Sequence, residues 1–104
     1  MARMRFGDAI DRAVTEAMSD DPRVVVFGED VPMLRAPLAA RFGKHRVIPA
    51  PISEGAFLGA AVGAAMGGLR PIAELMMIDF VAVALDALLN HAAKLEVFSG
   101  GRWR

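Results

Sequence analysis

The sequence predicts an α/β domain with a parallel β-sheet that helices cover on both faces. Three observations favour this class. Helical segments alternate with short strands rich in β-branched residues. The first strand is apolar without interruption, as strands of buried parallel sheets are. The chain has 104 residues, which fits a single domain. Because no repeat, linker or low-complexity tract divides it, we expect one domain over residues 1–104.

The first element is an amphipathic helix. Apolar residues recur at helical spacing from Phe6 to Ala17, and we expect the helix to end near Pro22. Residues 23–27 then form a strand that Gly28 closes. Since this strand does not alternate between apolar and polar residues, both of its faces should be buried.

The next segment is rich in proline. Residues 32–37 are expected to form a loop, and residues 38–42 a short helix that Gly43 ends. A second, brief strand covers residues 47–48. It should end at Pro49, because proline cannot donate to a strand ladder.

The second half begins with a glycine-rich helix. Ser53 stands at the N-cap position and Glu54 in the first turn, where the helix dipole favours a negative charge; the helix should run to about residues 67–68. A third strand is expected at residues 71–77. The last helix, from about residue 80 to 97, is apolar nearly all round and should be covered on several sides.

Glycines recur every fourth residue along the helix after Ser53. Each interior glycine costs about 1 kcal/mol relative to alanine, so the pattern needs a reason. A close helix contact, within the chain or across a subunit boundary, is the preferred explanation over a close approach of a ligand. The stripe consists of Gly55, Gly59, Gly63 and Gly67.

Composition excludes several classes of function. The 12 basic and 12 acidic residues give no net charge, which argues against a nucleic-acid surface. Without cysteine, disulfides, zinc–thiolate sites and thiol nucleophiles are impossible. The longest uncharged run, residues 55–69, is short for a membrane span. We therefore expect a cytoplasmic protein that binds neither nucleic acid nor membrane and holds no metal ion.

Chemistry-bearing residues follow each expected strand. Glu29 and Asp30 come after the first strand, Glu54 after the second, and Asp79 and Phe80 after the third. Each has an ordinary structural explanation, as a loop acid, a first-turn glutamate or a core aromatic. Their convergence at one edge of a parallel sheet, where ligands of such sheets bind, favours a site. By contrast, we expect His45 to be solvated and His91 to be a hydrogen-bonded core residue.

Taken in order, these segments resemble the β subunit of the thiamine-diphosphate-dependent E1 component of 2-oxoacid dehydrogenase complexes, a group that includes pyruvate, branched-chain and acetoin dehydrogenases. The resemblance covers nearly the whole chain. It implies that residues 1–104 are the N-terminal part of a transketolase-like pyrimidine-binding domain. The motifs that carry it include Phe27-Gly28-Glu29-Asp30-Val31, Pro51-Ile52-Ser53-Glu54, Gly68-Leu69-Arg70-Pro71 and Asp79-Phe80.

The resemblance also implies roles for individual residues. Glu54 would hydrogen-bond N1′ of the cofactor's aminopyrimidine ring and favour the imino tautomer, whose 4′-nitrogen then removes the thiazolium C2 proton. Phe80 would pack on that ring, while Ile52 and Met76 would line its pocket. Glu29 matches an acid of a proton-relay tunnel proposed to join two active sites.

The implied activity is oxidative decarboxylation of a 2-oxo acid, with acyl transfer to the lipoyl domain of an E2 core. The implied assembly is α2β2, with Mg²⁺ and the diphosphate held by the α subunit. The 104 residues alone should be inactive. The alternatives are another transketolase-like enzyme, such as a deoxyxylulose-phosphate synthase, or a non-catalytic module that assembles through its helices.

Two further features bear on the identity of the whole protein. Three strands are few for a covered parallel sheet, and a Gly-Gly turn precedes Arg102-Trp103-Arg104, so we expect the chain to be part of a longer one. The stretch between Val31 and Phe42 is shorter than the family's usual one, and Pro49-Ala50 replaces its usual Asp-Thr. These departures leave the particular 2-oxo acid open.

Overall fold

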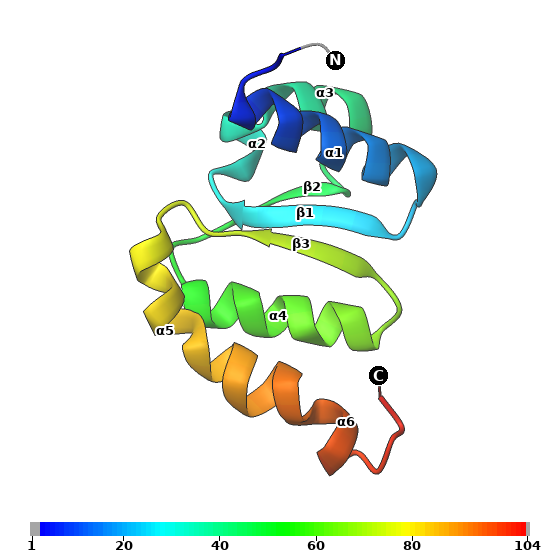
Figure 1. Ribbon diagram of the computed structural model, residues 1–104, viewed down its shortest axis with the longest axis vertical. Coiled ribbons are helices and arrows are strands. Elements are labelled where there is room, and N and C mark those ends of the chain that lie inside the picture. Colours follow the sequence, from blue (N-terminus) through cyan, green and yellow to red (C-terminus); the bar gives the residue numbers. More distant parts are fainter. Residues whose placement is uncertain (1–2, 104) are drawn as a thin grey trace.

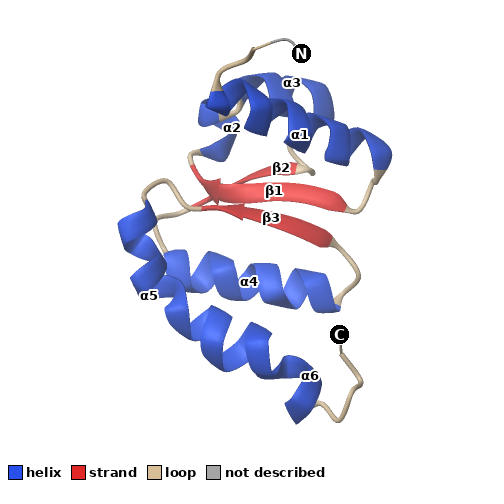
Figure 2. Cartoon of the chain, in the orientation of Figure 1, coloured by secondary structure: helices blue, strands red, loops and turns tan. Residues whose placement is uncertain are grey.

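A computed structural model describes residues 3–103; residues 1, 2 and 104 of the expected domain lie outside the described part. Within it, a three-stranded parallel sheet lies between two layers of helices (Figures 1 and 2), which confirms the predicted fold class. The strand order is β2-β1-β3. The strands are β1 (Val24–Glu29), β2 (Val47–Ala50) and β3 (Arg70–Glu74).

Helices cover the two faces of this sheet in two groups. The N-terminal group covers one face and comprises α1 (Phe6–Asp20), α2 (Val31–Leu34) and α3 (Ala36–Phe42). On the other face, α4 (Glu54–Met66) lies against the sheet, and a helical run from residue 78 to 98 packs outside it. That run contains α5 (Val81–Asp86), a π-turn (Ala87–His91) and α6 (Leu95–Phe98), with 3₁₀ turns at Ile78–Phe80 and Ala92–Lys94.

The central strand β1 divides its side chains between two cores. Val24 and Val26 pack with Met18 of α1 and Leu38 of α3 on one side. The neighbouring residues of β1 face the opposite core, which they share with α4 and the start of the C-terminal helical run. This second core consists of Val25, Phe27, Phe57, Leu58, Ala61, Ala84 and Ala87. The predicted burial of both faces of this strand is therefore confirmed.

The expected loop at residues 32–37 is wrong. Pro32 and Pro37 each stand in the first turn of a short helix, α2 or α3, where a backbone N–H has no intrahelical acceptor and proline costs nothing. The expected end of the short helix at Gly43 is confirmed, and Gly43 adopts φ +77°.

Two strand ends differ from expectation. β2 continues through Pro49 to Ala50, because it is an edge strand of the described sheet and an outward-facing nitrogen needs no partner there. β3 stops at Glu74 rather than residue 77. Glu74 pairs with Gly28, one residue before β1 itself ends, so little of β1 is left for a longer β3 to pair with.

The C-terminal helical run is less covered than its sequence predicts. Ala84 and Ala87 are buried against α4, yet Val97 and Phe98 are each 78% exposed. Val83, Leu85 and Leu89 are exposed as well. The expected cover on several sides is thus absent within residues 3–103. His91 is also exposed, so the expected core role of that histidine is wrong.

The glycine stripe of α4 makes a close contact at one end. A Cβ on Gly55 would lie 3.3 Å from the carbonyl oxygen of Val83, so α4 and α5 approach closely there. Apart from the adjacent residues and the nearby backbone of α4 itself, no described atom would lie within 4 Å of a Cβ on Gly59 or Gly63. None of the helices in residues 3–103 is both long and apolar enough to cross a bilayer.

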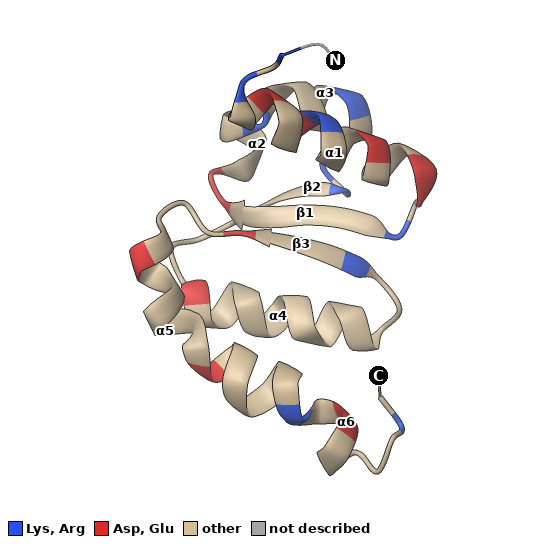
Figure 3. Ribbon diagram, viewed as in Figure 1, with Lys and Arg blue, Asp and Glu red and all other residues tan. Residues whose placement is uncertain are grey.

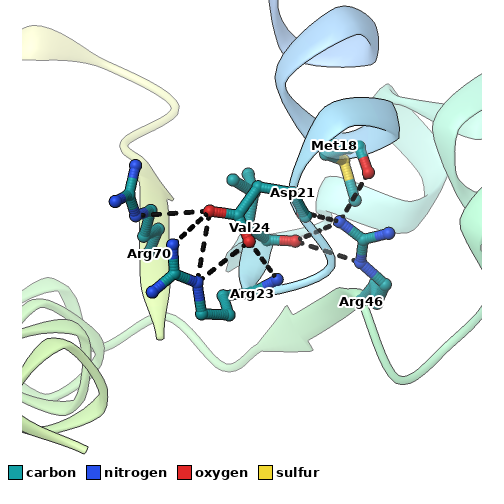
Figure 4. Close-up of polar contacts among 6 residues, drawn as sticks. All are labelled: Met18, Asp21, Arg23, Val24, Arg46 and Arg70. Carbon is teal, nitrogen blue, oxygen red and sulfur yellow. Dashed lines mark hydrogen bonds and ion pairs between the residues drawn. The ribbon is translucent and has the colours of Figure 1, made fainter. Parts of the chain in front are cut away.

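Asp21 joins the amino ends of two strands (Figure 4). Its carboxylate pairs with Arg23 at 2.8 Å, just before β1, and with Arg70 at 3.3 Å, the first residue of β3. Hydrogen bonds from the Arg23 side chain and backbone, together with both positive charges, lower the pKa of Asp21 to about 2. The ionised carboxylate therefore helps hold this edge of the sheet together.

Arg46 secures the same edge from the side of β2 (Figure 4). Its guanidinium is partly buried, and its Nη2 donates to the carbonyl oxygens of Met18 (2.8 Å), Asp21 (2.9 Å) and Val24 (2.7 Å). These carbonyls belong to the last turn of α1, the loop after it and the start of β1. Side-chain contacts therefore hold the amino edge of the sheet together.

Candidate functional site

The carboxyl ends of the strands lie together, as the sequence predicts. Glu29 is in register with Ala50, and Gly28 is in register with Glu74. Glu29 at the end of β1, together with the segments that leave β2 and β3 at this edge, accounts for every residue assigned a role from the sequence. In parallel α/β sheets this edge is where ligands bind.

Glu54 is the first residue of α4 and is only 7% exposed. Within residues 3–103 its carboxylate makes no hydrogen bond or ion pair. No buried side-chain oxygen or nitrogen of the described chain lacks a partner, so the oxygens of Glu54 must reach the surface. Burying most of a carboxylate without a hydrogen-bond partner costs free energy. Because the Glu54 oxygens reach the surface, a bound ligand could donate a hydrogen bond to them.

The local backbone explains how Glu54 is presented. Ser53 precedes α4 as predicted, and its carbonyl oxygen accepts hydrogen bonds from Ala56 and Phe57 at 2.8 and 3.0 Å. The expected side-chain cap is wrong, because the Ser53 hydroxyl donates instead to the carbonyl of Pro51 at 3.0 Å. In Figure 3, α4 carries charge at its first residue and none along the rest of its length.

The other residues assigned to the pocket expose apolar surface at this edge. Ile52 is 77% exposed and Met76 is also exposed. Phe80 is 41% exposed and belongs to neither buried cluster, so the alternative of a core aromatic does not describe it. Other large apolar residues exposed on the segments after β1 and β3 are Met33, Leu34, Met77 and Ile78.

Contact between α4 and α5 brings two of these segments together. Gly55, next to Glu54, lies against the carbonyl of Val83, which follows Phe80 by three residues. Glu29 ends β1 on the same edge and is half-buried. No hydrogen bond links it to Glu54 within the described residues.

An ion pair at this edge that involves Arg35 was not predicted from the sequence. From the junction of α2 and α3, Arg35 donates through Nε and Nη2 to the two carboxylate oxygens of Glu74, each at 3.0 Å. Its Nη1 also pairs with Asp11 of α1. The hydrogen bonds to Glu74, with the nearby charges, raise the pKa of Arg35 above its ordinary value. No spacing rule links residues 35 and 74, so only the fold shows the pair.

The described residues contain no cluster of three or more histidine, aspartate or glutamate side chains able to hold a metal ion. What the edge offers is a carboxylate with free acceptor capacity beside open apolar surface. Such a combination suits a flat heteroaromatic ring: the carboxyl group can share a proton with a ring nitrogen, and the apolar side chains can cover the ring faces.

Comparison with known proteins finds a matching domain family and similar β subunits. The family described as the transketolase pyrimidine-binding domain matches residues 2–100. The chain is 40% identical to the 2-oxoisovalerate dehydrogenase subunit beta of Bacillus subtilis, over 99% of this chain and 33% of the relative. It is 42% identical to the human mitochondrial pyruvate dehydrogenase E1 component subunit beta, over 90% of this chain and 28% of the relative. The chain thus spans about a third of the length of the curated relatives it matches.

Proposed function

Because this chain belongs to the family of transketolase pyrimidine-binding domains, we propose that it forms part of the β subunit of a thiamine-diphosphate-dependent 2-oxoacid dehydrogenase. The proposed reaction is oxidative decarboxylation of a 2-oxo acid, with transfer of the acyl group to the disulfide of a lipoyl domain. The two named relatives are subunits of dehydrogenases for 2-oxoisovalerate and pyruvate, so the proposal stays at the level of the class.

The main structural support for this function is the nearly buried carboxylate of Glu54, which has no partner in the described chain. Thiamine diphosphate, when bound, supplies the nucleophilic carbon on which decarboxylation depends. The aminopyrimidine end of this cofactor is a flat ring with nitrogens at its rim, which matches a carboxylate beside exposed apolar side chains. In this proposal Glu54 holds a proton at N1′ of that ring and so acts as an acid–base group.

The remaining assigned residues then have supporting roles. Phe80 presents an exposed ring that can cover the pyrimidine face, and Ile52 and Met76 supply apolar walls. Glu29 ends β1 on the same edge, where a relay of protons toward a second site would start. Exposure of these side chains supports the proposal, since a pocket completed by another subunit needs open apolar surface on this one.

We further propose that residues 1–104 are the N-terminal part of the pyrimidine-binding domain of a longer β subunit. The share of the relatives that the chain covers supports this extent. The partners would be an α subunit, which holds the diphosphate and Mg²⁺, a second β subunit and the E2 core. Under this proposal the 104 residues alone are inactive, and their compartment is the cytoplasm.

The decisive experiment uses the complete β subunit co-expressed with its α subunit. Purified α/β protein stripped of cofactor should recover 2-oxoacid decarboxylation when thiamine diphosphate and Mg²⁺ are added. Glu54→Gln should abolish most of this recovery, whereas Glu16→Gln on the exposed face of α1 should leave it intact. Equal recovery in both variants would refute the role of Glu54. Failure of the wild-type protein to bind thiamine diphosphate would refute the function itself.

A further inference from the structure

Glu74, the last residue of β3, is held on two sides. Its backbone lies so close to β1 that a Cβ on Gly28 would come within 2.2 Å of the Glu74 carbonyl oxygen. Its carboxylate oxygens each accept a hydrogen bond from Arg35, one from Nε and one from Nη2, both at 3.0 Å. Both partners of this pair are about three-quarters buried, which shields the interaction from solvent.

The geometry of the pair is specific to arginine. Two parallel N–H donors matched to one carboxylate fix orientation as well as distance, which a lysine ammonium cannot do. The third nitrogen, Nη1, pairs with Asp11 of α1. Arg35 therefore ties three separate parts of the chain, α1, the α2–α3 junction and the end of β3, at one point of the carboxyl edge.

The segment that departs from Glu74 carries two of the three apolar residues assigned to the pocket. Beyond Glu74 the chain leaves the sheet, and Met76 and Phe80 follow within six residues. A groove of about 320 Å³ runs beside the pair, lined by Arg35, Glu74, Leu75 and Ile78 among others. The ion pair therefore lies at the start of residues 75–80 and shares a groove with Leu75 and Ile78 of that segment.

We propose that Arg35 is a positioning residue of the cofactor pocket: by holding Glu74, it sets the direction in which residues 75–80 leave the sheet and so the placement of Phe80 over the bound ring. This inference rests on the proposed function. It adds a residue outside the assigned site.

The test uses the complete α/β protein with two Arg35 variants and one control. Arg35→Met removes the bridge, and Arg35→Lys keeps the charge but loses the paired donors. Arg12→Met is the control, because it removes the same charge from an exposed ion pair of α1. In that pair Nε of Arg12 lies 2.7 Å from Oε1 of Glu16. For each protein, the half-saturating concentration of thiamine diphosphate, kcat at saturating cofactor and the thermal midpoint without cofactor are measured.

We expect Arg35→Met to raise the half-saturating cofactor concentration about tenfold and Arg35→Lys to raise it less, with Arg12→Met close to wild type. A purely structural role would lower the thermal midpoint and leave cofactor binding of the folded protein unchanged, and that result would overturn the inference while the proposed function stands. If Arg35→Met does not fold, Arg35→Lys decides by the same comparison. Wild-type protein that binds no thiamine diphosphate would overturn both.

Discussion

Gly28 and Glu74 lie backbone to backbone at the carboxyl end of the sheet, where a Cβ on Gly28 would sit 2.2 Å from the Glu74 carbonyl oxygen. The same hypothetical atom would lie 3.2 Å from a methyl carbon of Val31, the first residue of α2. Position 28 therefore accepts only glycine, for reasons of space rather than of backbone angle. This contact sets how closely β1 and β3 approach just before both strands end.

Replacing Gly28 should consequently destabilise the fold. Gly28→Ala forces the end of β3 away from β1, which we expect to cost about 1–3 kcal/mol, as overpacking of a filled core does. Gly59→Ala is the matched control, because a Cβ there meets no described atom beyond the adjacent residues and nearby backbone of α4. Alanine also favours a helix by up to about 1 kcal/mol. Urea denaturation followed by circular dichroism compares the two. Equal stability of both variants would show that the strands can separate freely.

The second prediction concerns Glu54 and the acid–base step. In the α/β protein, Glu54→Gln should retain cofactor binding but slow exchange of the C2 proton of bound thiamine diphosphate by about a hundredfold or more, since general acid–base groups contribute that much. Exchange is followed by proton NMR after quenching in D₂O. A rate near that of wild type would leave Glu54 with no more than a favourable place at the N-terminus of α4.

Phe80 provides a prediction that separates pocket from core. Because the ring is 41% exposed and outside both buried clusters, Phe80→Ala should leave the thermal midpoint of cofactor-free protein nearly unchanged. Cofactor affinity should fall by about 1 kcal/mol through lost stacking and burial. Isothermal titration with thiamine diphosphate measures the affinity. A lower thermal midpoint with unchanged affinity would assign Phe80 to packing instead.

The pH dependence of stability follows from Asp21. Its pKa falls from 3.8 in the unfolded chain to about 2 in the folded one, chiefly through hydrogen bonds from Arg23. A lowered folded-state pKa stabilises the fold above the unfolded pKa, and this contribution disappears as the pH falls from about 4 toward 2. The gap in urea midpoint between wild type and Asp21→Asn should therefore narrow over that range. Asp20→Asn serves as control, since Asp20 has no ion pair in the described chain; a constant gap for Asp21→Asn would contradict the linkage.

Local sequence rules account for the elements whose neighbours are close in the chain. The uninterrupted apolar run of β1 predicted a strand buried on both faces, and the structure places Val24 and Val26 in one core and Val25 and Phe27 in the other. The placement of Glu29, Glu54 and Phe80 at one edge followed from the parallel order of the strands. These features depend on periodicity and topology, which the sequence expresses directly.

Features that depend on distant partners were not predictable in the same way. Pro32 and Pro37 indicated a loop, yet each fits the first turn of a helix once Leu38 packs into the core. The end of β3 at Glu74 is set by where β1 ends, and the bridge from Arg35 spans 39 positions. No local sequence pattern encodes the end of β3 or the Arg35–Glu74 bridge. Both therefore became visible only in the three-dimensional structure.

The last prediction is that the 104-residue chain associates with itself. Large apolar side chains are exposed at both the carboxyl edge and the C-terminal helical run, where Val97 and Phe98 are each 78% exposed. In the described sheet, β2 and β3 each have one open edge, which can pair with another copy. Exposed large apolar side chains and open strand edges are typical of surfaces that another copy or subunit covers.

Sedimentation velocity across a dilution series measures this association. We expect the weight-average sedimentation coefficient to rise with concentration well above that of a monomer. Val97→Lys with Phe98→Lys should reduce the rise, because two charges on that surface oppose association. The matched pair Arg5→Ala, at the residue before α1, and Arg12→Ala, on the exposed face of α1, should not. A single monomer peak at every concentration, together with cooperative unfolding, would show instead that the sheet and its two helical layers suffice without a partner.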